Sequence, residues 1–145
     1  MLSKLLIAFL LLALTVLIHA GGLTIVMRRL PLSKVVDDAR FGPRTWLLIR
    51  LASWVITIHI VEIAMWAFFF WWKKCLPDFE SSLYFSVVTY TTVGYGDLVL
   101  AQGWRLFAGV EALTGILMCG WSTGFFVIVA SKLYGARLQT KQNLK

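Results

Sequence analysis

Three long apolar runs limit the folds that this chain can adopt. They cover residues 5–27, 51–72 and 106–133, and about 20 apolar residues in an α-helix are enough to cross the hydrocarbon core of a bilayer. Apolar residues make up 59% of the 145 residues and charged residues 14%, whereas an average soluble domain carries about 25% charged residues. The sequence therefore predicts an all-α membrane protein with three transmembrane helices.

A secretory signal peptide is the alternative interpretation of the first run. Lys4 would then form its charged region, and cleavage would occur before Gly21. The apolar stretch continues past this position to the basic pair Arg28 and Arg29. This continuation favours a transmembrane helix over residues 1–27.

Residues 78–99 lie between the second and third runs, and they are too polar for a membrane span and too apolar for a solvated loop. A helix over residues 79–90 would descend about 18 Å at 1.5 Å per residue, and residues 92–96 in an extended conformation would return about 16 Å. Non-helical backbone at membrane depth is stable only where protein buries it or where it lines a water-filled cavity. We therefore expect a re-entrant pore helix, with Asp78 or Ser81 as its N-cap, followed by a loop that faces a pore.

The loop has the sequence Thr92-Val93-Gly94-Tyr95-Gly96 and is followed by Asp97. An extended backbone offers one carbonyl per residue to a dehydrated cation if alternate residues adopt conformations that point all carbonyls the same way. Gly94 and Gly96 allow this because they have no Cβ that forbids positive φ, and the ring of Tyr95 can wedge outward and hold the diameter of the strand. A single strand cannot encircle an ion, so the chain must oligomerise.

Residues 86–96, including Thr89 and Thr91, and the following Asp97 resemble the signature of tetrameric potassium channels, and the resemblance extends over residues 51–133. It implies a four-fold symmetric assembly with K⁺ as the permeant ion and no cofactor. It also implies that the Thr92 hydroxyl completes the innermost ion site. The carbonyls that would form the ion sites belong to Thr92, Val93, Gly94 and Tyr95. The implied pore domain consists of an outer helix over residues 51–72, a pore helix over 79–90, a filter over 92–96 and an inner helix over 104–133.

The third apolar run has one face with a small polar group. At about 100° per residue, Ile116, Cys119, Thr123 and Val127 fall within an arc of about 80°. The resemblance places this face on the conduction path, as the lining of an inner cavity. It also places Gly115 at the hinge of the inner helix, for which close helix packing is the alternative role.

Asp97 lacks the two partners that support the corresponding aspartate in some relatives. Val88 occupies the position of a carboxylic acid behind the filter, and Phe85 replaces a tryptophan whose ring nitrogen bonds the aspartate. Tyr84 is the nearest phenol that can substitute. We therefore expect Tyr84 and Asp97 to support the filter together.

Glu111 lies roughly opposite the cavity face of the third run, at the depth of the pore helix. A carboxyl inside a membrane is expensive unless it is paired or protonated. Ser86, Thr89 or Tyr90 could hydrogen-bond it. We therefore expect Glu111 and Thr89 to brace the filter from behind.

Three further polar residues are expected at similar depth on the first two helices. His59 and Glu62 share a face of the second helix at a spacing of three, and His19 lies on the first. They are expected to form a polar layer that docks the first helix onto the pore domain. Proton sensing is the alternative role, because histidine titrates near neutral pH.

Basic residues are concentrated in two segments. Ten of the fourteen Lys and Arg residues lie in residues 28–50 or beyond residue 131, and such segments remain in the cytoplasm. The loop over residues 28–50 and the tail over residues 134–145 are therefore expected inside, and the N-terminus and the filter mouth outside. The expected location is the cell membrane, as in the bacterial inner membrane. We expect contacts with membrane lipids, including anionic headgroups, and none with nucleic acid.

The sequence thus predicts a homotetrameric potassium channel that conducts K⁺ passively. A weakly selective cation channel is one alternative, in which reduced support lets the filter relax. A non-conducting regulatory subunit of a channel assembly is another. No cluster of nucleophile, base and metal ligands is present in the sequence, so we expect no enzymatic activity.

Overall fold

The computed structural model describes residues 2–29 and 41–142, with side chains from residue 3 to 29 and from 42 to 133. These residues form helices and no strand, which confirms the predicted all-α fold. The helices are α1 (Leu2–Arg29), α3 (Phe41–Trp72), α4 (Phe79–Tyr90) and α5 (Arg105–Gln142).

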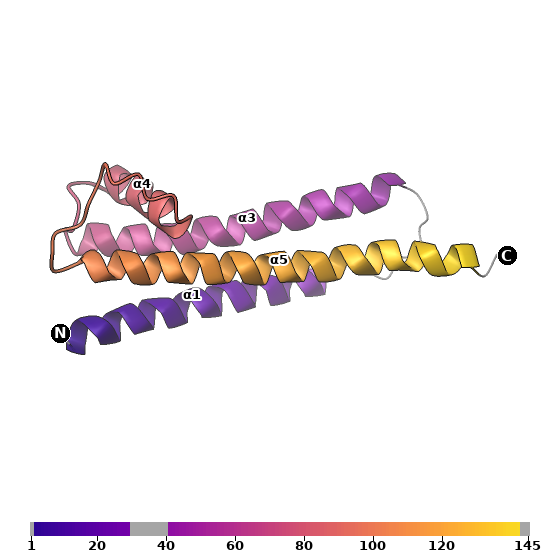
Figure 1. Cartoon of the computed structure of the whole chain (residues 1–145), viewed down its shortest axis with the longest axis horizontal. Helices are drawn as coiled ribbons and strands as arrows, with labels where there is room; N and C mark the ends of the chain where they lie inside the picture. The colour runs from indigo at the N-terminus through magenta and orange to yellow at the C-terminus, as the bar shows by residue number, and fades with distance from the viewer. Residues whose placement is uncertain (1, 30–40, 143–145) are drawn as a thin grey trace.

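The three long helices lie side by side, and the short helix α4 packs at one end of them (Figure 1). Helices α1 and α5 run in one direction and α3 runs in the other. The start of α1, helix α4 and the loop after it share one end of the bundle, and the end of α5 lies at the other. Three of the described helices are long and apolar enough to cross a membrane, which confirms the predicted number of membrane-spanning helices. Helix α4 and the loop after it lie together at one end of the bundle, as expected for a re-entrant segment.

Helix α4 begins where its capping residue predicts. Asp78 has an extended backbone, and its side chain accepts a hydrogen bond of 2.7 Å from the backbone N–H of Ser81. This contact satisfies one of the four free N–H groups at the helix start. Of the two predicted N-caps, Asp78 is therefore the correct one.

The end of α3 is fixed by a turn that reverses the chain toward α4. Lys74 has a φ of 53°, and its N–H donates to the carbonyl of Trp71 at 2.9 Å. The N–H of Cys75 donates to the carbonyl of Phe70, also at 2.9 Å. This pair of bonds is the Schellman motif, with a lysine in the left-handed position that glycine usually occupies.

Two helix boundaries differ from the prediction. Helix α3 begins at Phe41, so residues 41–50 are helical and do not belong to the predicted basic loop; Pro43 fits in the first turn, where its missing N–H has no partner to lose. Helix α5 continues to Gln142, nine residues beyond the predicted end. Of the predicted loop, residues 30–40 lie outside the described part, as do residues 143–145 of the predicted tail.

Two apolar clusters hold the long helices together. The first surrounds α4 and includes Trp66 and Phe70 of α3 and Met118 of α5. The second lies toward the other end of the bundle, where Leu23 of α1 packs with Leu133 of α5. Because α1 contributes to both clusters, it is part of the packed bundle along most of its length.

Candidate functional site

The loop after α4 has an alternating backbone. Thr92, Gly94 and Gly96 have φ values of 61°, 58° and 78°, whereas Val93 and Tyr95 between them do not have positive φ. This is the alternation under which successive carbonyls of an extended chain can point the same way. The prediction for the two glycines is confirmed, but Thr92 was not foreseen, because positive φ is rare for a β-branched residue.

The start of this filter loop is bonded to the last turn of α4. The N–H groups of Val93 and Gly94 both donate to the carbonyl of Val88, at 3.0 and 3.1 Å, and the N–H of Thr92 donates to that of Thr89 at 2.9 Å. These bonds use the carbonyls that a helix leaves free at its C-terminus. The position of the filter loop therefore depends directly on the position of α4, and Thr89 supports it through its backbone.

The filter loop is open to one side in a single subunit. Val93 is 53% exposed and Tyr95 is 72% exposed. Tyr90, at the end of α4, is buried, so the chain becomes exposed only after the helix ends. A strand exposed in this way does not enclose an ion.

Asp97 and Tyr84 form the contact that the sequence predicts. The Tyr84 hydroxyl donates a hydrogen bond of 2.7 Å to Asp97 Oδ2, and this bond holds the pKa of the Asp97 carboxyl below its usual value while it raises the pKa of the phenol. Phe85 is buried in the apolar cluster around α4, and Val88 is buried as well. Neither side chain can hydrogen-bond Asp97, and Tyr84 makes this contact instead.

We expect Tyr84→Phe to weaken the filter loop in a pH-dependent manner. Since the hydrogen bond lowers the pKa of Asp97, its stabilising effect is present above the ordinary aspartate pKa of about 3.9 and is lost as the pH falls through the lowered value. Thermal unfolding should therefore show a less stable variant at neutral pH, with a difference from the unmodified protein that shrinks in acid. In an Asp97→Ala background, which removes the acceptor, the same substitution should have little further effect, and a full second loss of stability would contradict the pairing.

Glu111 lies behind α4 but without the predicted hydrogen bond. Its side chain is fully buried, and neither its carboxyl oxygens nor the Ser86 hydroxyl has a hydrogen-bond partner, although Ser86 is close enough to act on the carboxyl. The Tyr90 hydroxyl is directed elsewhere, to Glu62. Tyr90 is therefore not the predicted partner of Glu111, because Glu62 takes its hydroxyl; Ser86 remains the neighbour that acts on the carboxyl, and the bracing role of Glu111 stays a prediction.

The predicted cavity residues share an exposed face of α5. Ile116 is 60% exposed and Val127 is 58% exposed, and Cys119 and Thr123 are exposed between them. The Thr123 hydroxyl donates to the backbone carbonyl of Cys119 at 2.9 Å, so its oxygen can still accept from water. That this face lines a cavity stays a prediction. The exposure of the four residues agrees with it.

Gly115 of α5 packs directly against the backbone at the end of α4. A Cβ at this position would lie 2.0 Å from the carbonyl oxygen of Tyr90 and 2.8 Å from its carbon. Only a glycine leaves room for this backbone. The structure thus gives Gly115 the packing role, and its function as a hinge stays a prediction.

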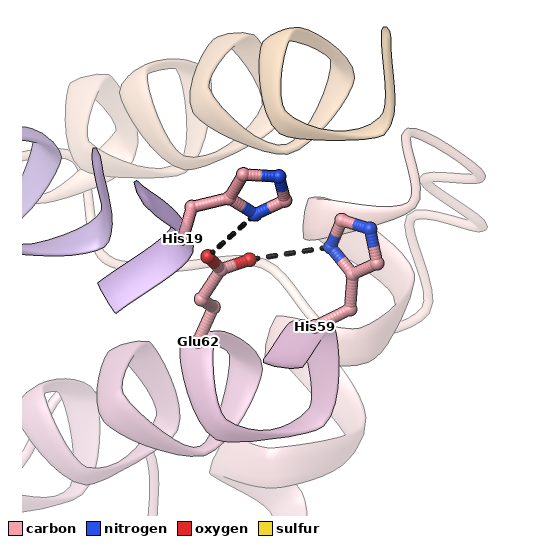
Figure 2. Close-up of side chains that lie close together, drawn as sticks. All are labelled: His19, His59 and Glu62. Carbon is pink, nitrogen blue, oxygen red and sulfur yellow. Dashed lines mark hydrogen bonds and ion pairs between the residues drawn. The ribbon is translucent and has the colours of Figure 1, made fainter. Parts of the chain in front are cut away.

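A buried polar cluster joins the helices below the filter, as Figure 2 shows for three of its members. Its residues are His19 of α1, His59 and Glu62 of α3, Tyr90 of α4 and Ser122 of α5. One carboxylate oxygen of Glu62 forms a hydrogen bond of 3.0 Å with His19 Nδ1, and the other forms one of 3.2 Å with His59 Nδ1. The predicted polar layer between α1 and the pore domain is confirmed. The parts played by Tyr90 and Ser122 were missed, since periodicity does not show toward which neighbour a polar side chain turns.

Three side chains of the cluster are of types that commonly bind metal ions, and the structure brings them together. The ligand atoms of His19, His59 and Glu62 lie within 4.8 Å of one another. A tetrahedral zinc ion with bonds near 2.1 Å would hold its ligand atoms about 3.4 Å apart. The residues contact one another directly, through hydrogen bonds of 3.0 and 3.2 Å from the two histidines to Glu62, so their ligand atoms are used within the cluster.

The comparison with known proteins agrees with this site. Residues 53–132 match the family model described as ion channel, which is more than half of the 145 residues. No curated protein and no solved structure matches the chain. The matched segment contains α4, the filter loop and the membrane-crossing parts of α3 and α5, whereas α1 lies outside it. The chain therefore belongs to this family of ion channels.

Proposed function

We propose that this ion channel is a homotetramer that conducts K⁺ selectively and passively across the cell membrane. The observation that carries the proposal is the alternating backbone of the filter loop, with positive φ at Thr92, Gly94 and Gly96. In potassium channels, backbone carbonyls of this sequence replace the hydration shell of the ion. The carbonyls of residues 92–95 would serve as ligands here.

The exposure of the filter loop supports assembly of several copies. Val93 and Tyr95 are more than half exposed in one subunit, and an ion needs oxygen ligands from all sides. Four copies around one axis would place four carbonyls at each level of the filter. The same assembly would bring the exposed face of α5 that contains Cys119 and Thr123 toward a common cavity.

Electrostatics favours a cation on this pathway. The C-terminal end of α4, which carries negative partial charge, ends at the filter loop. Asp78 and Asp97 lie at the same end of the bundle as the filter mouth, and the backbone N–H of Ser81 holds the pKa of Asp78 below its usual value, so both are anionic at neutral pH. With the basic segments in the cytoplasm, this end and the N-terminus would face outward.

A weakly selective cation channel is the second candidate, and one observation favours it. Tyr84, which alone replaces the two familiar partners of Asp97, is 40% exposed. A single contact at an exposed position restrains the filter less than two buried ones. Such a filter would widen more easily and admit Na⁺.

Cation uptake into liposomes that contain the purified protein distinguishes these candidates. Uptake of rubidium tracer in exchange for K⁺, well above uptake of Na⁺ and blocked by Ba²⁺, is the result expected for a potassium channel. Equal uptake of Na⁺ and K⁺ would replace the proposal by the weakly selective channel. A folded tetramer without any cation uptake would be a non-conducting subunit.

A further inference from the structure

The buried polar cluster below the filter contains both histidines of the chain, and the conduction pathway does not use them. His19 and Glu62 are fully buried and Tyr90 is 1% exposed. Ionisable side chains at this depth in a membrane protein are costly unless they serve a function or are paired. The protons that these contacts require can be counted from the distances.

Both imidazole rings have the same two kinds of neighbour. His19 Nδ1 lies 3.0 Å from one Glu62 oxygen, and its Nε2 lies 3.2 Å from Ser122 Oγ. His59 Nδ1 lies 3.2 Å from the other Glu62 oxygen and 3.1 Å from the Tyr90 oxygen. The Nε2 atom of His59 also lies 3.2 Å from Ser122 Oγ. Each ring thus has the carboxylate at one nitrogen and the same serine at the other.

While Glu62 is ionised, neutral histidines cannot satisfy these contacts. Each Nδ1 must carry a hydrogen, because a bare nitrogen would face a carboxylate oxygen with lone pair against lone pair, and the Tyr90 O–H already donates to Glu62. A neutral imidazole has one N–H, so both Nε2 atoms would then be acceptors. Ser122 has a single O–H and can donate to only one of them. One Nε2 therefore remains without a partner.

One additional proton completes the network. The ring that takes it becomes an imidazolium and donates from Nε2 to Ser122 Oγ, while the Ser122 O–H donates to the other ring. The positive charge of this ring balances the Glu62 carboxylate, so the five side chains carry no net charge. Without the proton the cluster would have an unbalanced negative charge in an interior where such charges are strongly destabilising.

The other titratable groups around the cluster come from α4 and α5. Tyr90 faces Glu62 and His59, and Cys119 of α5 interacts electrostatically with both Tyr90 and Glu62. Glu111 of α5 also interacts electrostatically with Tyr90. Among the described residues none of these groups adds a positive charge near Glu62, so an ionised Glu62 takes its balancing charge from a histidine.

We propose that the cluster of His19, His59, Glu62, Tyr90 and Ser122 is a binding site for one proton, shared between the two histidines, and that this proton fastens α1 to the pore helix. The proton exchanges through His59, whose side chain is 16% exposed while those of His19 and Glu62 are fully buried. Tyr90 immediately precedes the filter loop, and its backbone touches Gly115. Loss of the proton shifts Tyr90, which disturbs the filter loop that follows α4 and the contact with Gly115, and conduction is reduced.

Nitrogen NMR of the full-length protein in liposomes tests the proton count directly. Because the chain has only two histidines, every ring signal from isotope-labelled histidine belongs to the cluster. At about pH 8, where a histidine with the ordinary pKa of about 6.5 is neutral, one ring per subunit should be an imidazolium, or two rings should each be half protonated. Two neutral rings at this pH would overturn the proposal.

Two substitutions identify the groups that hold the proton. Glu62→Gln keeps the shape of the side chain and removes its charge, so both rings should be neutral at about pH 8. Glu111→Gln removes the other buried carboxyl of this region and should leave the ring signals unchanged. If Glu62→Gln does not fold, Ser122→Ala serves instead, and its imidazolium signal should disappear at a lower pH than in the unmodified protein. An imidazolium that persists unchanged in either cluster variant would contradict the assignment.

The effect on conduction rests on the proposed channel function, whereas the proton count does not. Rubidium uptake should fall as the pH rises through the range in which the imidazolium signal disappears. Uptake that stays constant through this range would disprove the link to the pore. An imidazolium signal without uptake at any pH would support the proton site and overturn the channel proposal.

Discussion

Gly115→Ala is expected to separate α4 from α5 and to abolish cation uptake. The new Cβ would lie 2.0 Å from the carbonyl oxygen of Tyr90, and this atom belongs to the backbone, so no rotamer change can remove the overlap. Overpacking of a well-packed interior costs about 1–3 kcal/mol, and a backbone clash belongs at or above the upper end. Since the filter loop is bonded to the last turn of α4, displacement of that turn also displaces the ion sites.

Thermal unfolding and rubidium uptake measure this effect against a matched control. Gly109 lies on the same helix, and apart from its chain neighbours and the backbone of its own helix no atom of the subunit lies within 4 Å of a Cβ built there. Gly109→Ala should therefore be neutral or slightly stabilising, because alanine suits a helix interior better than glycine by about 0.5–1 kcal/mol. If Gly115→Ala is as stable as this control and changes only the opening of the channel, the hinge role is correct and the packing role is wrong.

Gly94→Ala is expected to abolish selective conduction while the subunit remains folded. Gly94 has a φ of 58°, and a Cβ at this position would meet no atom of the same subunit within 4 Å apart from its chain neighbours, so the effect within the subunit is conformational. A side chain in the left-handed region costs about 1–2 kcal/mol per residue, and each subunit of the assembly would bear it. The filter loop would relax toward negative φ and turn one carbonyl of each subunit away from the ion.

The readout for Gly94→Ala is the ratio of rubidium to Na⁺ uptake, together with the unfolding temperature. Gly21→Ala on α1 is the control, because Gly21 also has open space around its Cβ position and lies in a helix. It should leave both quantities nearly unchanged. A Gly94→Ala channel with the original ratio would mean that the backbone conformation at this position does not control selectivity.

The helices that cross or enter the membrane could be predicted because apolar length and capping specify them. The pore helix was predicted over residues 79–90 and is observed there, since Asp78 marks its start and the filter sequence marks its end. The start of α3 at Phe41 could not be predicted. Residues 41–50 lie beyond the apolar run, where a mixed sequence can be either helix or loop, and neighbouring helices decide between them.

The contacts of the site were predictable where one donor had one available acceptor. Tyr84 reaches Asp97 because the substitutions at the two familiar positions leave no competing partner. Tyr90 had two possible acceptors, Glu62 and Glu111, at similar depth, and it bonds Glu62. Helical periodicity gives the face of a residue but not the outcome of competition between two neighbouring helices.

The position of His19 has a consequence for how this channel can be taken apart. The segment that matches the ion channel family excludes α1, yet α1 carries a histidine that bonds the buried carboxylate of Glu62, and its Thr15 accepts a hydrogen bond from the Trp66 indole. A pore segment excised without α1 would leave these polar groups facing lipid. The pore and its first helix therefore behave as one indivisible module, and a chimera built on residues 53–132 alone would need a substitute histidine at the same depth.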